Sequence, residues 1–384
     1  MLFISCFSEF HKTMIIYISM IAVILLCAMG NAVLTQTAAD TIRIQHRKLL
    51  VYIPMLYIIF WTGIRTQFVD TAAYIQTYMD MPSESLRSIF SYVKSFEKDR
   101  LFYFLSAIFK YIFGDNYHWW LFTISLLCGL CVVRQIYRHS DSPYFSLYLF
   151  MTMNIFTWMM NGIRQFIAIT VLFALSDWLV DQKKRWFYVL AVVVLSFVHS
   201  SALYALPFIV IVMFSKPWDW KMILLSVAVA VAVANADRFT EILTETVAQD
   251  YAATFDESAG SNVIRTFVAY VPVAISFWGR KIIRRKEDPY LNLCVNMSLV
   301  CALLYTLSSV TNGILVGRMP MYFQVYNLLL LPWLIKHCFS AKERRILTIL
   351  CVGCYMVFFL YQATIAGNYY YASELTGFLG KSIW

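Results

Sequence analysis

The sequence predicts an all-helical (all-α), polytopic integral membrane protein that crosses the bilayer about a dozen times. Of its 384 residues, 60% are hydrophobic and only 14% are charged, whereas a soluble domain is about half apolar and about a quarter charged. Apolar runs long enough to cross a hydrocarbon core recur from Met14 to Ala366. Short joints separate these runs, and alternate joints carry bursts of Lys and Arg. No soluble domain of ordinary size fits between them.

Twelve apolar runs are expected to span the membrane, within a range of about 10 to 14. An amphipathic, aromatic-rich segment at 101–113 is expected to lie along the outer interface or to dip into it. The chain 1–384 is expected to form a single membrane domain, with longer outer loops at 65–117 and 237–262. The expected spans are 14–34, 49–64, 118–133, 143–161, 164–180, 186–198, 200–214, 221–236, 263–278, 290–311, 314–335 and 346–366.

The first apolar run is long, and no small-residue cleavage site follows it, so a cleavable signal peptide is not expected. Met14 opens that run and would serve as an initiator equally well as Met1.

The net charge of +9 is distributed as a topology signal and does not indicate nucleic-acid binding. The joints on one side hold 19 Lys or Arg and 7 Asp or Glu, and the opposite side holds 12 and 14. By the positive-inside rule the first side is the cytoplasm, so both termini are expected outside. The joints on the basic side are 35–48, 134–142, 181–185, 215–221, 279–289 and 336–345.

The nine cysteines predict neither a disulfide framework nor a metal site. The two C-x-x-C pairs, Cys128 with Cys131 and Cys351 with Cys354, lie in apolar helices without polar ligands beside them, so they are expected to be packing residues. No cofactor or metal is expected. The chain has no Walker A, G-x-G-x-x-G, H-E-x-x-H or G-x-S-x-G motif of a soluble enzyme.

Arg164 is the most informative single residue. It stands in NGIRQFIAI, at the expected outer start of the span 164–180. A cation there opposes the helix dipole, and an arginine near a span costs up to about 2.5–3.5 kcal/mol, depending on its depth. Arg164, Gln165 and the free N–H groups of that helix end predict an anion site, with Asn161 on the same face. The alternative is an arginine that snorkels to the interface.

Other charged residues gather at the expected outer ends of spans. Arg65, Asp70 and Tyr74 stand in RTQFVDTAAY, and in a helix Asp70 and Tyr74 would share one face. The acid is either a general base or part of a structural ion pair. A second candidate acid is either Asp99, which opens DRLFYFL, or Glu97 close by. Arg318, in TNGILVGRMPMYFQVY, repeats the pattern of Arg164 with the same alternative of snorkelling.

His199 interrupts an apolar run of 29 residues, 186–214, that basic residues flank at both ends. Each half reaches only about 20 Å against a core of about 30 Å, so the turn at His199 is expected below the outer membrane surface. Polar backbone at that depth must be buried in protein or line a water-filled cavity, which predicts His199 at the floor of an outward-facing cavity. There it would bind or protonate a leaving oxyanion, take a proton from an attacking hydroxyl, or only hydrogen-bond a neighbouring helix.

Four segments in succession resemble the EpsG-like branch of the Wzy polysaccharide polymerases. Arg65-x4-Asp70-x3-Tyr74 resembles that branch's R…D…Y segment, and NGIRQFIAI its N-x-x-R-Q-x-I-A helix. FVHSSALYALP resembles F-H-x-S-A-L-x-x-L-P, and DRLFY resembles E-P-x-F-Y, although Asp99-Arg100 stands where the family has Glu-Pro. The match covers about residues 60–210, with Arg318 and Tyr322 as a later element.

The resemblance implies a GT-C-like, Wzy-type bundle in a bacterial inner membrane. Such an enzyme transfers a growing glycan from undecaprenyl pyrophosphate to the next lipid-linked repeat unit on the outer face, by an inverting and metal-independent reaction. It implies lipid-linked oligosaccharides and membrane lipid as partners, together with flippase and chain-length-regulator proteins. Asp70 is the preferred base for the acceptor hydroxyl. The expected catalytic residues are Arg164, His199, Asp70 and Asp99, and the expected substrate-binding residues are Arg65, Tyr74, Asn161, Gln165, Arg318 and Tyr322.

Two other functions remain open from the sequence. A flippase or transporter of lipid-linked sugars would usually show inverted repeats, and no convincing repeat is present. A membrane O-acyltransferase would account for His199 but not for the arginines.

Overall fold

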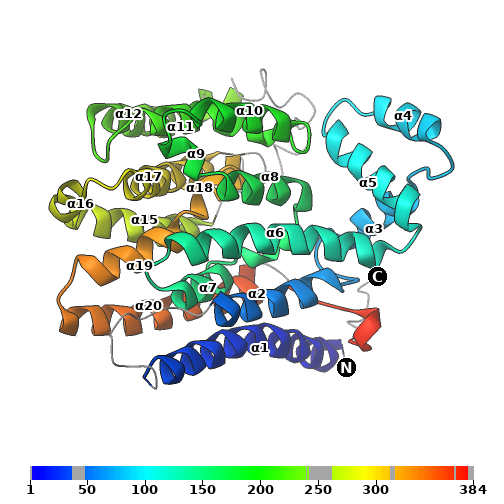
Figure 1. Ribbon diagram of the computed structural model, residues 1–384, viewed down its shortest axis with the longest axis horizontal. Coiled ribbons are helices and arrows are strands. Elements are labelled where there is room, and N and C mark those ends of the chain that lie inside the picture. The colour runs from blue at the N-terminus through cyan, green and yellow to red at the C-terminus, as the bar shows by residue number, and fades with distance from the viewer. Residues whose placement is uncertain are drawn as a thin grey trace. The chain divides into compact units, whose positions relative to one another are not determined.

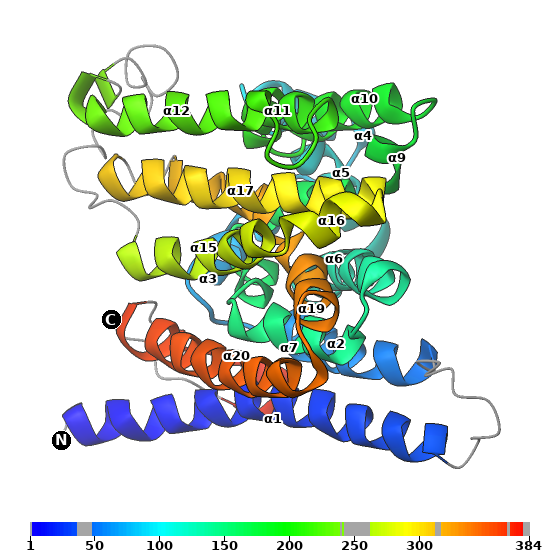
Figure 2. The same ribbon diagram turned by 90° about the vertical axis from the view of Figure 1, so that its left-hand side faces the viewer.

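The computed structural model describes residues 2–36, 48–238, 240–241, 262–311, 316–366 and 369–378. Within these ranges the chain is helical throughout and has no strand, only two isolated bridges, of which one joins Gln67 to Ala372. The predicted outer loop at 237–262 lies almost entirely outside the described residues. The chain divides into two compact units, whose helices are drawn in Figures 1 and 2.

The first unit combines residues 1–174, 191–202 and 346–384. Its longest helices pack as a bundle: α6 lies against α2 and α8, and α1 lies against α2 and α7. The shorter helices α3, α4 and α5 lie between α2 and α6 in sequence. Its elements are α1 (Leu2–Gln36), α2 (Lys48–Gly63), α3 (Thr71–Met79), α4 (Leu86–Lys94), α5 (Arg100–Phe113), α6 (Tyr117–His139), α7 (Pro143–Thr152), η1 (Phe156–Met159), α8 (Ile163–Ala174), most of α20 (Ala341–Tyr361), η4 (Gln362–Ala366) and η5 (Glu374–Thr376).

Two glycines allow α2 and α6 to approach closely. A Cβ at Gly63 would lie 2.7 Å from the Phe122 ring, and a Cβ at Gly129 would lie 2.5 Å from the Ile59 side chain. Small residues at such crossings let two helix backbones approach closely. Helices in a membrane depend on such close packing, because no hydrophobic effect drives them together in lipid. This contact holds α2, and therefore the turn that follows it at Arg65, against the long helix α6.

The second unit, residues 175–190 and 203–345, is built around α17. This helix is buried along most of its length and packs against α12, α15, α18 and α19. The elements are α9 (Asp177–Val180), α10 (Arg185–Ser196), α11 (Ser201–Met213), α12 (Trp220–Ala234), α15 (Val263–Trp278), α16 (Arg280–Lys286), α17 (Pro289–Val310), η3 (Val316–Arg318), α18 (Met321–Gln324) and α19 (Asn327–His337). The boundary between the units passes through α10 and α11.

Nine of the twelve predicted spans each fall on a single helix, and six of these match its bounds within two residues. The helices α1, α6 and α20 extend further than predicted, and the other three spans do not correspond to one helix. The expected span 143–161 ends as α7 at Thr152, because Asn154 adopts a left-handed backbone (φ 61°) that stops a helix. The span 164–180 is interrupted between α8 and α9, and 314–335 is divided into η3, α18 and α19. Breaks in apolar segments of this kind were not visible from hydrophobicity alone.

In the part of the chain that the structure describes, four helices are long and apolar enough to cross a membrane: Thr13–Ala32, Tyr117–His139, Pro289–Val310 and Ala341–Ile365. Six more apolar helices have 10–17 residues. Large apolar side chains also lie on the outside of these helices, among them Leu26, Phe267 and Ile349, each more than 60% exposed. An exposed apolar surface of this kind is typical of contact with lipid. Several apolar helices thus mark the chain as a membrane protein.

Candidate functional site

The candidate site is centred on Asp99, which immediately precedes α5. Asp99 adopts a left-handed backbone (φ 59°, ψ 26°), a conformation that aspartate tolerates better than most residues. Its own carbonyl accepts the N–H of Phe102, and the next residue but one, Leu101, donates its N–H to Phe197 at 2.8 Å. This backbone bond ties the start of α5 to the break between α10 and α11.

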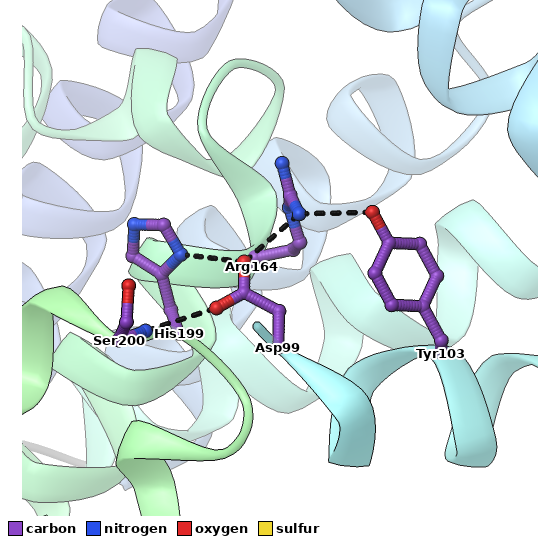
Figure 3. A network of polar contacts seen from close by, with 5 residues as sticks. All are labelled: Asp99, Tyr103, Arg164, His199 and Ser200. Atoms are coloured by element: carbon purple, nitrogen blue, oxygen red, sulfur yellow. Dashed lines mark hydrogen bonds and ion pairs between the residues drawn. The ribbon is translucent and has the colours of Figure 1, made fainter. Parts of the chain in front are cut away.

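The carboxylate of Asp99 joins Arg164 and His199, as Figure 3 shows. One oxygen, Oδ2, lies 2.8 Å from Nη1 of Arg164 and 3.0 Å from Nδ1 of His199. The other oxygen accepts the backbone N–H of Ser200 at 2.9 Å. The carboxylate is only 6% exposed, whereas the side chains of Arg164 and His199 are 30% and 21% exposed. The buried acid therefore contacts two partly accessible groups. One is a permanent cation, Arg164, and the other is a group that can exchange a proton, His199.

These contacts determine the ionisation of Asp99. Burial raises the pKa of its carboxyl group, but the hydrogen bond and charge of His199, the charge of Arg164 and the Ser200 amide outweigh it, so that the pKa lies below its usual value. Because a carboxylate can only accept, Nδ1 of His199 must carry the proton in this contact. Nε2 of the neutral imidazole is then left with a lone pair that can accept a proton.

An aromatic surface borders Arg164. The arginine donates from Nη1 to the Tyr103 hydroxyl at 3.1 Å, and its guanidinium carbon lies 5.7 Å from the Tyr103 ring and 6.0 Å from the Phe102 ring. Tyr103 in turn stacks on Phe96, with ring centroids 3.7 Å apart. Stacked rings beside a cation provide a flat apolar face together with a hydroxyl for hydrogen bonding.

Arg164 is the second residue of α8, as the sequence predicted for a helix start. Gly162, with φ 69°, precedes that helix and allows the sharp turn from η1 into α8. The Tyr74 side chain, on α3, also hydrogen-bonds Arg164. Asn161 is half-buried just before the helix, and its Oδ1 has no partner among the described residues. Gln165 is buried.

Arg65 faces inward. It is fully buried, its Nε donates to Thr71 at 3.0 Å, and Nη1 donates to the carbonyl of Thr62 near the end of α2. Burial lowers the pKa of its guanidinium to about 10, against the opposing effect of the Tyr371 and Tyr74 hydroxyls. The residue is still charged at neutral pH, and a cation at the carboxyl end of a helix complements its dipole. Its contacts with Thr62 and Thr71 indicate that Arg65 stabilises the turn between α2 and α3.

Other expected site residues lie apart from this network or in the second unit. Asp70 immediately precedes α3 and is half-buried, and no hydrogen bond or ion pair joins its side chain to Asp99, Arg164 or His199. In the second unit, Arg318 is exposed at the end of η3 and Tyr322 is buried in α18.

Two contributors to the site were not among the expected residues. Tyr103 lies one helical turn after Asp99, so its position within DRLFY was the available signal. Ser200 contributes its backbone N–H, and no side-chain pattern reveals such a donor.

Comparison with known protein families places the chain in one of them. A model of the EpsG family matches residues 48–373, which is most of the chain and includes every expected site residue. The chain belongs to the EpsG family. The resemblance noted from the four sequence segments is thereby confirmed. EpsG-family membership indicates a polysaccharide-polymerase type of function, associated with glycosyltransferase-like enzymes. No curated protein and no solved structure matches the chain.

Proposed function

We propose that this EpsG-family protein polymerises lipid-linked oligosaccharide repeat units at the outer face of a bacterial inner membrane. Its substrates would be glycans carried on undecaprenyl pyrophosphate. The observation that carries this proposal is the Asp99 carboxylate, which is bonded at once to Arg164 and to His199. An acid that orients a histidine beside an arginine suits a reaction in which a hydroxyl loses a proton and a diphosphate leaves.

In the proposed reaction, a hydroxyl oxygen of the incoming repeat unit attacks the anomeric carbon of the growing chain. The new glycosidic bond forms as the bond between that carbon and the diphosphate oxygen breaks, with inversion at the carbon. The hydroxyl proton passes to His199, and undecaprenyl pyrophosphate leaves with the bonding electron pair. No metal is required, because arginine cations supply the charge that stabilises the leaving oxygen.

His199 is our preferred base for the acceptor hydroxyl. Its Nδ1 is bonded to Asp99 at 3.0 Å, which favours the tautomer whose Nε2 accepts a proton, and the resulting imidazolium would face a carboxylate. Asp70, which the sequence favoured for this role, has no such orienting partner among its contacts. It stays a candidate for binding the acceptor or for proton transfer.

Arg164 is proposed to bind the diphosphate of the donor. Its Nη1 contacts Asp99 and Tyr103, and Tyr74 also hydrogen-bonds the side chain. Because a guanidinium has five N–H donors, others stay available to phosphate oxygens. The N–H groups at the start of α8 would add to this anion site. Arg318 is proposed to contribute a second cation, with Tyr322 beside it in sequence. Tyr74, Asn161 and Gln165 would contact substrate, and Arg65 would support the site.

The membrane arrangement is part of the proposal. Twelve membrane crossings in a GT-C-like bundle, basic joints in the cytoplasm and both termini outside would put the break at His199 on the outer side. The helices on either side of it, α10 and α11, have 12 and 13 residues, which is about 18–20 Å and shorter than a hydrocarbon core of about 30 Å. Such a break would open into an outward-facing cavity that receives lipid-linked substrates from the bilayer. Flippase and chain-length-regulator proteins are proposed as partners.

The experiment that tests this function replaces Arg164 by Ala in cells that depend on this protein for polymer. We expect loss of polymer by at least about 10²-fold, because a donor to the developing charge is removed, while the protein still inserts in the membrane. The measurement is the ladder of lipid-linked chain lengths, normalised to the amount of protein in the membrane. Arg87→Ala is the matched control, since Arg87 is an exposed arginine on the nearby helix α4. A normal ladder from Arg164→Ala would contradict the assignment.

The same cells separate the alternative functions. Loss of a polymerase leaves single repeat units facing outward. Loss of a flippase leaves these units facing the cytoplasm, and loss of an O-acyltransferase leaves full-length polymer without acyl groups. Replacement of the residue that acts as the base should lower turnover while substrate binding is retained. Comparing His199→Asn with Asp70→Asn therefore distinguishes the two candidate bases.

A further inference from the structure

A groove runs between α11 and α12 in the second unit, well separated in sequence from Asp99 and Arg164. Figures 1 and 2 show these two helices next to each other. The groove has a volume of about 410 Å³, and seven of its eight lining residues are apolar. The exception is Lys221, in the first turn of α12. The lining residues are Val210, Ile211, Phe214, Trp220, Lys221, Leu224, Leu225 and Ala228.

One end of the groove is basic. Lys221 lies at this end and donates from Nζ to the carbonyl of Phe214 at 2.7 Å, and an ammonium has two further N–H donors. The guanidinium carbon of Arg185, the first residue of α10, lies 5.4 Å from the Phe214 ring centroid. The basic joints 181–185 and 215–221 therefore meet at Phe214.

The two acids of the joints 181–185 and 215–221 do not balance the cations of these joints. Asp181 pairs with Lys184 at 3.4 Å and accepts the N–H of Lys183, and Asp219 caps α12. The Arg185 Nε is buried without a partner among the described residues. The two joints therefore keep a surplus of positive charge, with five cations (Lys183, Lys184, Arg185, Lys216 and Lys221) against the two acids.

The surroundings of the groove are those of a membrane interface. Trp220, at its basic end, is 68% exposed, and Trp186, whose ring lies 6.4 Å from that of Phe214, is 61% exposed. Exposed tryptophans beside lysines and arginines lie at the level of lipid head groups. Leu224 lies one helical turn after Trp220 and is 58% exposed along the groove. From Trp220 to Leu224 the groove therefore runs from the level of the head groups towards the acyl region.

We propose that this groove binds one anionic phospholipid, with an acyl chain between α11 and α12 and its phosphate held by Lys221 and Arg185. Basic pockets between membrane helices on the cytoplasmic side bind anionic head groups in this manner. Both joints belong to the basic side of the chain, so the lipid would come from the cytoplasmic leaflet. The proposal concerns lipid binding and does not depend on the reaction proposed above.

The test measures lipid binding to the purified full-length protein by native mass spectrometry. Phosphatidylglycerol is compared with phosphatidylcholine carrying the same acyl chains. We expect tighter binding of phosphatidylglycerol, by about tenfold to thirtyfold, because each cation near the head group contributes about 1 kcal/mol. The double variant Arg185→Ala, Lys221→Ala should lose this preference. Ala228→Trp should fill the groove and weaken the binding of both lipids.

The control is Lys342→Ala, Arg345→Ala, which removes two exposed cations from another basic joint. It should bind phosphatidylglycerol as the wild type does. Equal binding of the two lipids by wild type, or an equal loss in the control, would overturn the proposal. So would stronger binding of undecaprenyl phosphate than of phosphatidylglycerol, because the groove would then belong to the carrier. Melting midpoints identify a misfolded variant, and if the double variant misfolds, Ala228→Trp and the wild-type preference decide the outcome.

Discussion

At the scale of single residues, Asp99 is the residue that joins Arg164 to His199 in the candidate site. Its left-handed backbone costs energy in an L-residue, and strain of this kind persists where the surroundings hold it in place. The surroundings here are Arg164, His199 and the Ser200 N–H. The same position is Glu in the family pattern that the sequence resembles, so a negative charge is common to both forms.

Replacing Asp99 by Asn should lower turnover by about 10²–10⁴-fold, because an amide neither selects the productive tautomer of His199 nor balances an imidazolium. Asp99→Glu keeps the charge and should retain more turnover, although the left-handed backbone costs it about 1 kcal/mol. The measurement is turnover and apparent substrate affinity for both variants, with the larger change expected in turnover. Full turnover by Asp99→Asn would show that Asp99 does not position His199.

The pH dependence of stability provides a second readout for Asp99. Since its pKa is lowered in the folded protein, its stabilising effect is present above the ordinary carboxyl value of 3.8 and is lost as pH falls through the lower folded value. The difference in melting midpoint between wild type and Asp99→Asn should therefore be larger at about pH 5 than at about pH 3. An equal difference at these two pH values would contradict a stabilising charge on Asp99.

At the scale of elements, the C-terminal segment Tyr369–Phe378 packs across the turn that contains Arg65. The carbonyl of Ala372 accepts the N–H groups of Thr66 and Gln67 at 2.8 and 3.2 Å. Ser373 donates to the carbonyl of Ile64 at 2.7 Å, so the segment binds the chain on both sides of Arg65. Residues about 300 positions apart in sequence thus hold together the turn that precedes α3.

Tyr371→Ala tests the importance of this segment. Tyr371 is 1% exposed and donates from its hydroxyl to the carbonyl of Trp61 at 2.6 Å. Its truncation should lower stability by about 3–5 kcal/mol and reduce polymer formation, because a large buried ring is lost beside Arg65. The control Tyr111→Ala removes a tyrosine that is 48% exposed on α5 and should cost less than about 0.5–1 kcal/mol. Equal melting midpoints for the two variants would contradict the packing argument.

At the scale of the whole molecule, alternating basic joints predict the direction of the chain in the membrane. Basic joints stay in the cytoplasm because translocating Lys and Arg is unfavourable. The outer segment with α4 and α5 and the joint before α20 should therefore face opposite sides. The polar site at Asp99 would then lie on the side that receives translocated substrates.

Cysteine labelling measures this direction. Ser95→Cys, in the exposed turn after α4, should react with a membrane-impermeant thiol reagent in intact spheroplasts. Lys342→Cys, in the first turn of α20, should react only after the membrane is permeabilised. The unmodified protein controls for labelling of its own cysteines. Reversed accessibility would place the candidate site in the cytoplasm and exclude a reaction on the outer face.

Most helix positions could be predicted from the sequence, because apolar runs and the polar joints between them are local features. The bounds of α2, α5, α12, α15 and α17 differ from the prediction by at most two residues. The break after Thr152 could not be predicted, because it depends on the left-handed backbone of a single residue, Asn154, within a continuous apolar run.

By itself, the sequence determined that the chain is a helical membrane protein of the EpsG family, and it named Asp99, Arg164 and His199 as candidates. Only the tertiary structure decided that these three meet, because Arg164 and His199 stand 65 and 100 positions after Asp99. The tertiary structure also turned Arg65 inward, added Tyr103 and the Ser200 N–H to the site, and left Asp70 outside the network. Local composition determines where a helix forms, but contacts between distant segments determine which side chains share one carboxylate.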